Sequence, residues 1–192
     1  MDAEPKLIDY GILAQALEFY QARGYNYREV PWVVSPEATN VTLPVDRIAT
    51  SVSYGDLVGS AEQSFIELMI RGDKLTKHCA ITPCFRDEER YDALHHAYFM
   101  KCELYDADAT DANLHSMIDI AVAFHGRYLP VEVTETGPDA YDIVSVNSGH
   151  ELGSYGFRQY KGQRFIYGTG CALPRLTTVI TGVGASVAPM FA

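Results

Sequence analysis

The sequence predicts an α+β fold in which an antiparallel β-sheet is flanked by helices. Apolar residues recur at helical spacing in some segments, and residues suited to strands alternate between two faces in others. Along the chain these segments follow the order helix, hairpins, helix, hairpins, helix, which is typical of helices packed on an antiparallel sheet. With 192 residues, 47% of them hydrophobic, the chain can bury the core of one domain covering residues 1–192.

In the first part of the chain, a helix is predicted over residues 7–23, because its apolar side chains share one face and Gly24 follows at the position of a left-handed cap. A strand is predicted over 25–30, ended by Pro31, and a loop after it. Ser60 and Gln63 match the capping box that begins a helix, which is expected to end near Gly72.

Two extended segments, 80–88 and 98–105, are predicted to be strands with one strongly polar face each. Alternation in the second strand places Phe99, Lys101 and Glu103 on the same face. An aromatic ring among charges is unusual for a surface that only meets water. This face is therefore predicted to be the floor of a binding site.

The rest of the chain is expected to contain two helices and three strands. Thr110 can cap a helix that runs to about residue 125, where Gly126 ends it. Strands are predicted over 141–146, 151–158 and 164–170, and Pro174 is expected in the first turn of a final helix.

Composition disfavours several classes of partner. The chain has 15 basic and 25 acidic residues, for a formal net charge of −10, which repels a polyanion such as tRNA. Neither a signal peptide nor an apolar run of membrane-spanning length is visible, so a cytoplasmic protein without a membrane partner is expected. The four cysteines lack zinc-site spacing and are expected to be buried free thiols, with a cysteine-bound zinc as the open alternative.

Three segments resemble, in the same order, the signature motifs of class II aminoacyl-tRNA synthetase catalytic domains. The first is the helix and strand of residues 7–31, which resembles motif 1, the element that builds the dimer interface in that family. This resemblance implies a homodimer. Amphipathic helices before a strand that ends in proline are common, so a purely structural role is the alternative.

The second segment is CFRDE at residues 84–88, followed by a loop and by FMKCE at 99–103, and it resembles motif 2, which holds ATP. A planar guanidinium suits this role, because it offers paired donors to the charge that builds on phosphate oxygens. The alternative is an ion pair of Arg86 with Glu103 or Glu88 on a solvated face. By the resemblance, Arg86 contacts the α-phosphate, Glu88 and His96 position the nucleotide, and Phe99 stacks on adenine.

The third segment, YGTGCALPRL at residues 167–176, resembles motif 3, a glycine-rich strand that leads into a helix with an early arginine. The resemblance implies that Arg175 is a second catalytic arginine, which reaches the γ-phosphate. Its glycines are expected to let the backbone approach the ligand closely. The chain departs from the family at Pro174, where an acidic residue is usual.

Residues 141–144 and 151–158 resemble the strand pair before motif 3 in the aspartyl- and asparaginyl-type synthetases. This resemblance implies that Glu151 and Asp142 bind a Mg²⁺ ion that bridges the ATP phosphates, a role for which hard carboxylate oxygens are suited. Asp142 has a turn or surface role as its alternative. The same stretch supplies Ser154 and Arg158 as substrate-binding candidates.

Glu62 lies where the family uses a loop carboxylate to hold the α-amino group of the substrate. Together with Lys101 and Glu103 it gives the expected pocket both charge signs, as a zwitterionic amino acid requires. Favourable interaction with a helix N-terminus is the alternative explanation for Glu62.

The resemblance thus implies a ligase that uses ATP and Mg²⁺ to activate an amino acid, or a related carboxylate, as an acyl-adenylate. The expected acceptor is ammonia, a small molecule, a protein or a carrier, because the acidic chain has no room for an anticodon-binding barrel. Two alternatives stay open. One is a non-catalytic paralogue that senses a ligand or acts as a partner subunit, and the other is a minimal synthetase that charges tRNA.

Overall fold

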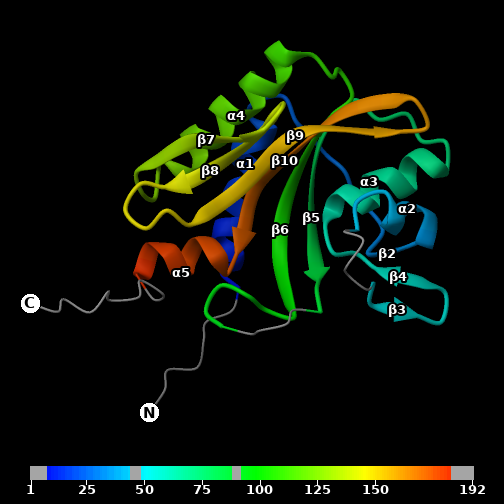
Figure 1. The fold of residues 1–192 in the computed structure, drawn as a ribbon, viewed down its shortest axis with the longest axis horizontal. Helices are drawn as coiled ribbons and strands as arrows, with labels where there is room; N and C mark the ends of the chain where they lie inside the picture. Colours follow the sequence, from blue (N-terminus) through cyan, green and yellow to red (C-terminus); the bar gives the residue numbers. More distant parts are fainter. Residues whose placement is uncertain (1–7, 44–48, 88–91, 183–192) are drawn as a thin grey trace, which may run out of the picture.

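The computed structural model describes residues 8–43, 49–87 and 92–182 (Figure 1). Its helices are α1 (Tyr10–Gln21), α2 (Pro36–Asn40), α3 (Ala61–Ile70), α4 (Asp111–His125) and α5 (Arg175–Thr181). The short strands are β1 (Asn26–Tyr27), β2 (Val33–Val34), β3 (Ser51–Val52) and β4 (Gly55–Leu57). The longer strands are β5 (Lys77–Phe85), β6 (Tyr98–Asp106), β7 (Val131–Gly137), β8 (Ala140–Ser145), β9 (Glu151–Tyr160) and β10 (Gln163–Leu173).

The main sheet has seven strands in the order β1-β5-β6-β10-β9-β8-β7. All of its neighbouring strands are antiparallel except β1 and β5, which run parallel. A second sheet, β2-β4-β3, lies beside α2 and α3 (Figure 1). The α+β fold with an antiparallel sheet flanked by helices is therefore confirmed.

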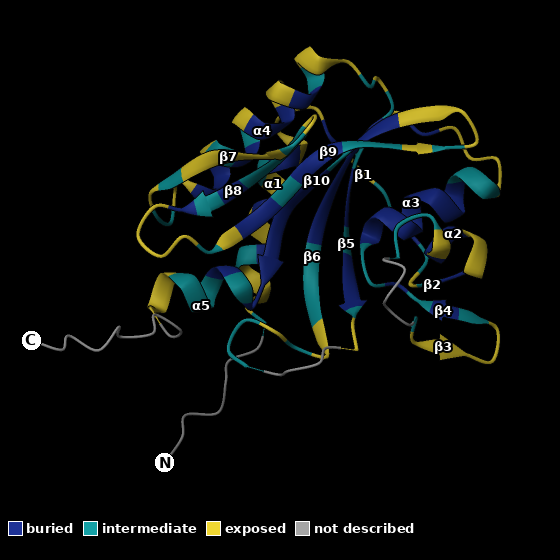
Figure 2. Ribbon diagram, in the orientation of Figure 1, coloured by how far each residue is buried: buried dark blue, intermediate teal, exposed yellow. Residues whose placement is uncertain are grey.

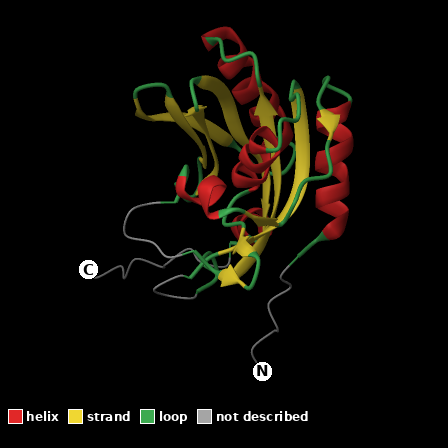
Figure 3. Cartoon of the chain, turned by 90° about the vertical axis from the view of Figure 1, so that its right-hand side faces the viewer, coloured by secondary structure: helices red, strands yellow, loops and turns green. Residues whose placement is uncertain are grey.

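The two faces of the main sheet carry separate hydrophobic cores. On one face α1 and α4 pack on the sheet, and their apolar side chains contact Cys102 and Leu104 of β6. On the other face α3 packs through Phe65 and Ile66 against Tyr105 of β6. Figure 2 shows the central strands as largely buried and β7 as exposed. Figure 3 views the sheet from its side and shows α1 lying against one face of it.

Gly24 and Thr110 lie at helix ends as predicted, whereas Asp9 is a cap that was not predicted and Pro174 differs from its prediction. The carboxylate of Asp9 accepts hydrogen bonds from the first backbone N–H groups of α1, and Gly24 follows the helix with a φ of 87°. The hydroxyl of Thr110 accepts from the Asn113 N–H at the start of α4. Pro174 is the residue before α5 and follows a cis peptide bond, so it precedes the first turn instead of lying in it.

Three local predictions differ from the structure. The strand predicted over residues 25–30 pairs only at Asn26 and Tyr27. The predicted loop after Pro31 contains the short helix α2, because Ser35 caps it and Pro36 occupies its first turn. Strand β7 was not predicted, although Val131 and Val133 alternate with Glu132 and Thr134; it forms an edge of the sheet and most of its residues are exposed. Within the described residues, no helix is long and apolar enough to cross a membrane.

Candidate active site

A cavity of about 480 Å³ lies on the face of the main sheet that α3 covers. The sequence predicted this face as a binding floor from the alternation in β6. Four of the side chains that line the cavity are cationic and two are anionic, which is the reverse of the charge balance of the chain. The charged lining residues are Arg86, Lys101, Arg158, Arg175, Glu62 and Asp87.

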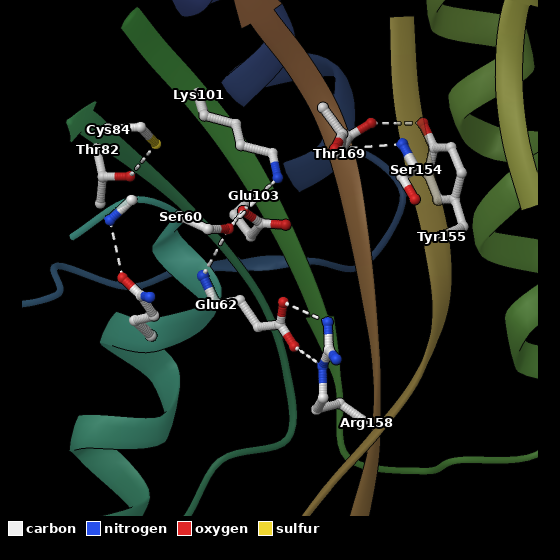
Figure 4. Close-up of polar contacts among 12 residues, drawn as sticks. Ser60, Glu62, Thr82, Cys84, Lys101, Glu103, Ser154, Tyr155, Arg158 and Thr169 are labelled. Atoms are coloured by element: carbon white, nitrogen blue, oxygen red, sulfur yellow. Dashed lines mark hydrogen bonds and ion pairs between the residues drawn. The ribbon is translucent and has the colours of Figure 1, made fainter. Parts of the chain in front are cut away.

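Three polar side chains form a hydrogen-bonded group at the cavity: Ser60 and Lys101 line it, and Glu103 is buried beneath them (Figure 4). Lys101 Nζ lies 2.8 Å from Glu103 Oε2, and the Ser60 hydroxyl donates to the same oxygen over 3.0 Å. The Lys101 side chain is 11% exposed and that of Glu103 1% exposed. Burial raises the pKa of Glu103, and Lys101 partly opposes this shift. This pairing replaces the alternative in which Arg86 forms an ion pair with Glu103.

Glu62 is not free to act alone, because it forms a two-point ion pair with Arg158 (Figure 4). Arg158 Nε and Nη2 lie 2.6 Å and 3.4 Å from the two carboxylate oxygens. The Arg158 guanidinium also lies over the Tyr167 ring, 5.0 Å from its centre. The structure thus unites two predicted substrate-binding residues that are 96 positions apart in the chain. A simple helix-dipole role does not account for this arrangement.

Arg86, which directly follows β5, and Arg175, the first residue of α5, also line the cavity. The Arg86 guanidinium lies 5.0 Å from the centre of the Phe99 ring, and its Nε donates to the carbonyl of Gly59 over 3.3 Å. Both arginines also line a smaller adjoining space of about 20 Å³, together with Phe99 and His96. His96 contacts the Ala93 carbonyl there. The predicted motif 2 residue Glu88 lies outside the described residues.

The two predicted metal ligands lie near Arg175. Arg175 Nη1 is 3.0 Å from Glu151 Oε1. Asp142 is opposite Ser154 in the β8–β9 pairing and forms a side-chain hydrogen bond with it. Burial raises the pKa of Asp142, and the charge of Glu151 raises it further, so the two carboxylates are close enough to interact. This oxygen donor set fits a hard cation such as Mg²⁺.

The glycines of the YGTGCALPRL segment serve the core. A Cβ added at Gly168 would lie 2.6 Å from both Met117 Sδ and Tyr155 Cδ1, and one at Gly170 would lie 2.7 Å from the Tyr20 ring. Packing in the core therefore accounts for glycine at these two positions, and the expected close approach of the backbone to a ligand stays a prediction. The absent side chains admit α1, α4 and β9 side chains instead.

The four cysteines are buried free thiols. Burial raises the pKa of Cys79 and Cys84 to about 11 and that of Cys171 to about 12, so these groups are protonated at neutral pH. Among the described residues, no three His, Cys, Asp or Glu side chains gather as a metal site. The free-thiol prediction is confirmed for these cysteines.

Several residues that line the cavity were not predicted as site residues, and two of them contact its charged groups. Ser60 was explained as a helix cap, yet its oxygen is 3.4 Å from the Glu62 N–H and closer to Glu103. Tyr167 lines the cavity below Arg158. Ser60 is 43 positions from Glu103 in the sequence, so local patterns could not reveal their contact. Tyr167 could have been found from its alternation with Thr169 along β10.

Neither a scan against protein-family models nor a search of curated proteins found a match. Solved structures do resemble the chain. A pyrrolysyl-tRNA synthetase from Desulfitobacterium hafniense superposes with a TM-score of 0.70 at 14% identity, covering 90% of this chain and 69% of that one. A cytoplasmic serine-tRNA ligase from Naegleria fowleri, in complex with AMP, has a TM-score of 0.70 at 14% identity, covering 94% and 49%.

A third structure, seryl-tRNA synthetase from Pyrococcus horikoshii complexed with ATP, has a TM-score of 0.68 at 14% identity and covers 90% of this chain and 49% of that one. The chain thus spans about half the length of the seryl enzymes. These structures lend no support to the aspartyl- and asparaginyl-type subgroup, which stays a prediction. At this identity the likeness concerns the fold alone. The chain has the fold of a class II aminoacyl-tRNA synthetase catalytic domain.

Proposed function

We propose that this chain binds ATP and activates an amino acid as an acyl-adenylate. The observation that carries the proposal is that Arg86 and Arg175 line the same small space next to a cavity whose lining holds charges of both signs. Two guanidinium groups can hold phosphate oxygens while charge builds on them during attack on the α-phosphorus. The polar end can hold the attacking carboxylate in line. Catalysis then comes from positioning and charge neutralisation.

The nucleotide occupies the end formed by Arg86, Phe99 and Arg175 in this proposal. Phe99 stacks on the adenine ring, His96 borders the same space, and Arg86 binds the α-phosphate. Arg175 binds the γ-phosphate, and to do so it breaks its ion pair with Glu151. The solved seryl-tRNA synthetases of the same fold hold AMP and ATP, which supports an adenine nucleotide as the ligand.

Asp142 and Glu151 would hold the Mg²⁺ ion, with Ser154 fixing the Asp142 carboxylate. The ion supplies neutralisation of the leaving pyrophosphate. Asp142 and Glu151 are already close enough in the fold for their negative charges to repel each other, so the two oxygen donors are in place before the ion binds. A cation that binds both relieves this repulsion, which favours its binding.

The substrate is an amino acid because the inner cavity offers two ion pairs side by side. Lys101 and Arg158 retain N–H groups beyond those used by Glu103 and Glu62, and Glu62 retains lone pairs beyond those used by Arg158. A zwitterion can therefore bridge the pairs with each charge near its opposite. Aspartate and asparagine come first among the acids to test, on the resemblance of residues 141–158.

The acceptor in this proposal is a small molecule, ammonia, a protein or a carrier, and not tRNA, because the net charge of −10 repels a polyanion. A homodimer through α1 completes the proposal. Size-exclusion chromatography with light scattering tests the dimer.

Pyrophosphate exchange into ATP, with Mg²⁺ and a panel of amino acids, tests the activation step. At least one acid is expected to stimulate exchange, and Arg86→Ala is expected to abolish it with the oligomeric state unchanged. Arg164→Ala is the matched control, because Arg164 lies over Phe157 outside the cavity and should leave exchange as in the wild type. Full exchange in Arg86→Ala would contradict the role of Arg86. Calorimetric binding of ATP without exchange for any acid would instead support a ligand-sensing protein.

A further inference from the structure

The Ser60 hydroxyl is held by a carboxylate at the floor of the cavity. Its Oγ donates to Glu103 Oε2 over 3.0 Å, whereas its contact with the Glu62 N–H is 3.4 Å long. Lys101 Nζ lies 3.5 Å from the same hydroxyl. Ser60 and Lys101 both line the cavity. This hydroxyl is therefore accessible to a ligand and already directs its proton at a base.

Glu103 has the properties of a general base for this hydroxyl. The side chain is fully buried, and its Oε1 has no hydrogen-bond partner among the described residues. Burial raises the pKa of Glu103, which makes it a stronger proton acceptor than an exposed carboxylate. Lys101 holds the accepting oxygen in place at 2.8 Å. A nucleophile, a base and a group that orients the base are thus within hydrogen-bond reach of one another.

Arg86, the proposed phosphate ligand, contacts the residue next to Ser60. Arg86 Nε donates to the carbonyl of Gly59, the residue before Ser60. In an acyl-adenylate a single oxygen separates the acyl carbon from the α-phosphorus. If Arg86 holds the phosphate beside Gly59, the acyl carbon would therefore be expected near Ser60, the next residue. The hydroxyl also lies at the N-terminus of α3, where the helix dipole stabilises the negative charge that develops on oxygen during attack.

We propose that Ser60 accepts the acyl group from the adenylate and forms an acyl-serine ester. Ser60 Oγ bonds to the acyl carbon, the bond between that carbon and the phosphate oxygen breaks, and AMP leaves with the bonding electrons. The hydroxyl proton passes to Glu103 Oε2. The ester then delivers the acyl group to water or to an amine acceptor. This inference rests on the proposed activation of a carboxylate by ATP.

A matched control exists in the same chain. Ser51 Oγ donates to Asp56 Oδ1 over 2.7 Å, which is the same pair of a serine and a carboxylate. Ser51 does not line the cavity, and Lys101 is absent from its partners. Ser51→Ala therefore removes a comparable hydroxyl without touching the proposed nucleophile.

The test incubates the full chain with ATP, Mg²⁺, pyrophosphatase and each acid of the panel, with no added acceptor, and quenches in acid from milliseconds to minutes. The expected result is a gain in intact mass equal to the acid less one water, mapped by peptide mass spectrometry to Ser60. Ser51→Ala is expected to keep the adduct and Ser60→Ala to lose it. Ser60→Cys should carry the same acyl group as a thioester, which neutral hydroxylamine cleaves readily. Glu103→Gln should slow adduct formation.

The outcomes separate this inference from the activation step. Exchange in the wild type without any acyl adduct overturns the acyl-serine ester and leaves activation standing. An adduct that maps to another residue, or that persists in Ser60→Ala, overturns it as well. If no acid supports exchange, the activation proposal fails first and the ester fails with it. Circular dichroism of each variant identifies any loss of fold.

Discussion

Replacement of Lys101 by methionine should destabilise the protein strongly at neutral pH. The substitution keeps the length of the side chain but leaves Glu103, whose side chain is 1% exposed, without its cation. At an effective dielectric of about 20, unit charges separated by the 2.8 Å of this pair attract by about 6 kcal/mol. Part of that attraction offsets desolvation, so we expect a net loss of about 3–5 kcal/mol in the free energy of unfolding.

The loss should shrink as the pH falls. Burial already raises the pKa of Glu103 in the wild type, and removing Lys101 raises the folded pKa further. As the pH falls, the variant therefore takes up the proton on Glu103 before the wild type does. Between the folded pKa of the variant and that of the wild type, the loss should decrease by about 1.4 kcal/mol per pH unit.

Urea denaturation followed by circular dichroism at pH 7 and pH 5 measures both effects. Lys101→Met with Glu103→Gln should recover most of the stability, because the buried charge is gone. Lys161→Met is the surface control: its partner Glu37 is half-exposed, and the unfolding midpoint should not move measurably. A loss below about 1 kcal/mol for Lys101→Met at pH 7, or no recovery in the double variant, would refute the buried ion pair as described.

Three further substitutions test other parts of the structure. Burial lowers the pKa of His125 to about 4. The stability that depends on neutral His125 is therefore fully present above pH 6.5 and is lost as the pH falls towards 4. In urea titrations across this range, His125→Gln should remove about 3 kcal/mol of the pH dependence. Gly168→Ala should lower the free energy of unfolding by about 1–3 kcal/mol in thermal melts, because the new Cβ meets Met117 and Tyr155; an unchanged melting temperature would contradict this packing. Asp142→Asn should raise the Mg²⁺ concentration needed for half-maximal pyrophosphate exchange, and an unchanged Mg²⁺ titration would remove Asp142 from the metal site.

Local patterns predicted the elements whose burial repeats along the chain. The helices α1 and α4 each bury one stripe of side chains, whereas α3 is buried on all sides from Ala61 to Leu68; apolar spacing and the signals at the helix ends located all three. In β6 the alternation separated Lys101 and Glu103 from Cys102 and Leu104, and the two sets do face different cores. Helix α2 has only five residues, too few for a helical period to be seen, and β7 is short, mostly exposed and rich in Glu and Thr, so its alternation was not recognised as a strand.

The sequence predicted many of the residues of the candidate site but not the contacts that they make with one another. Glu62 and Arg158 were assigned separately to substrate binding, and the ion pair between them depends on how β9 crosses the sheet near α3. The same is true of Ser60, which is 43 positions from Glu103. Contacts of this kind depend on the packing of distant elements, which no local spacing encodes.

The buried thiols can be used to measure how often the folded protein opens locally. Cys79, Cys102 and Cys171 lie in β5, β6 and β10, the strands at the middle of the sheet, and none is exposed. A thiol reagent can reach them only when these strands separate from α1 or from one another. The rate of labelling therefore measures how often the centre of the domain opens. A ligand that binds the folded state and contacts both β6 and α5 should slow the labelling, although it does not contact the thiols.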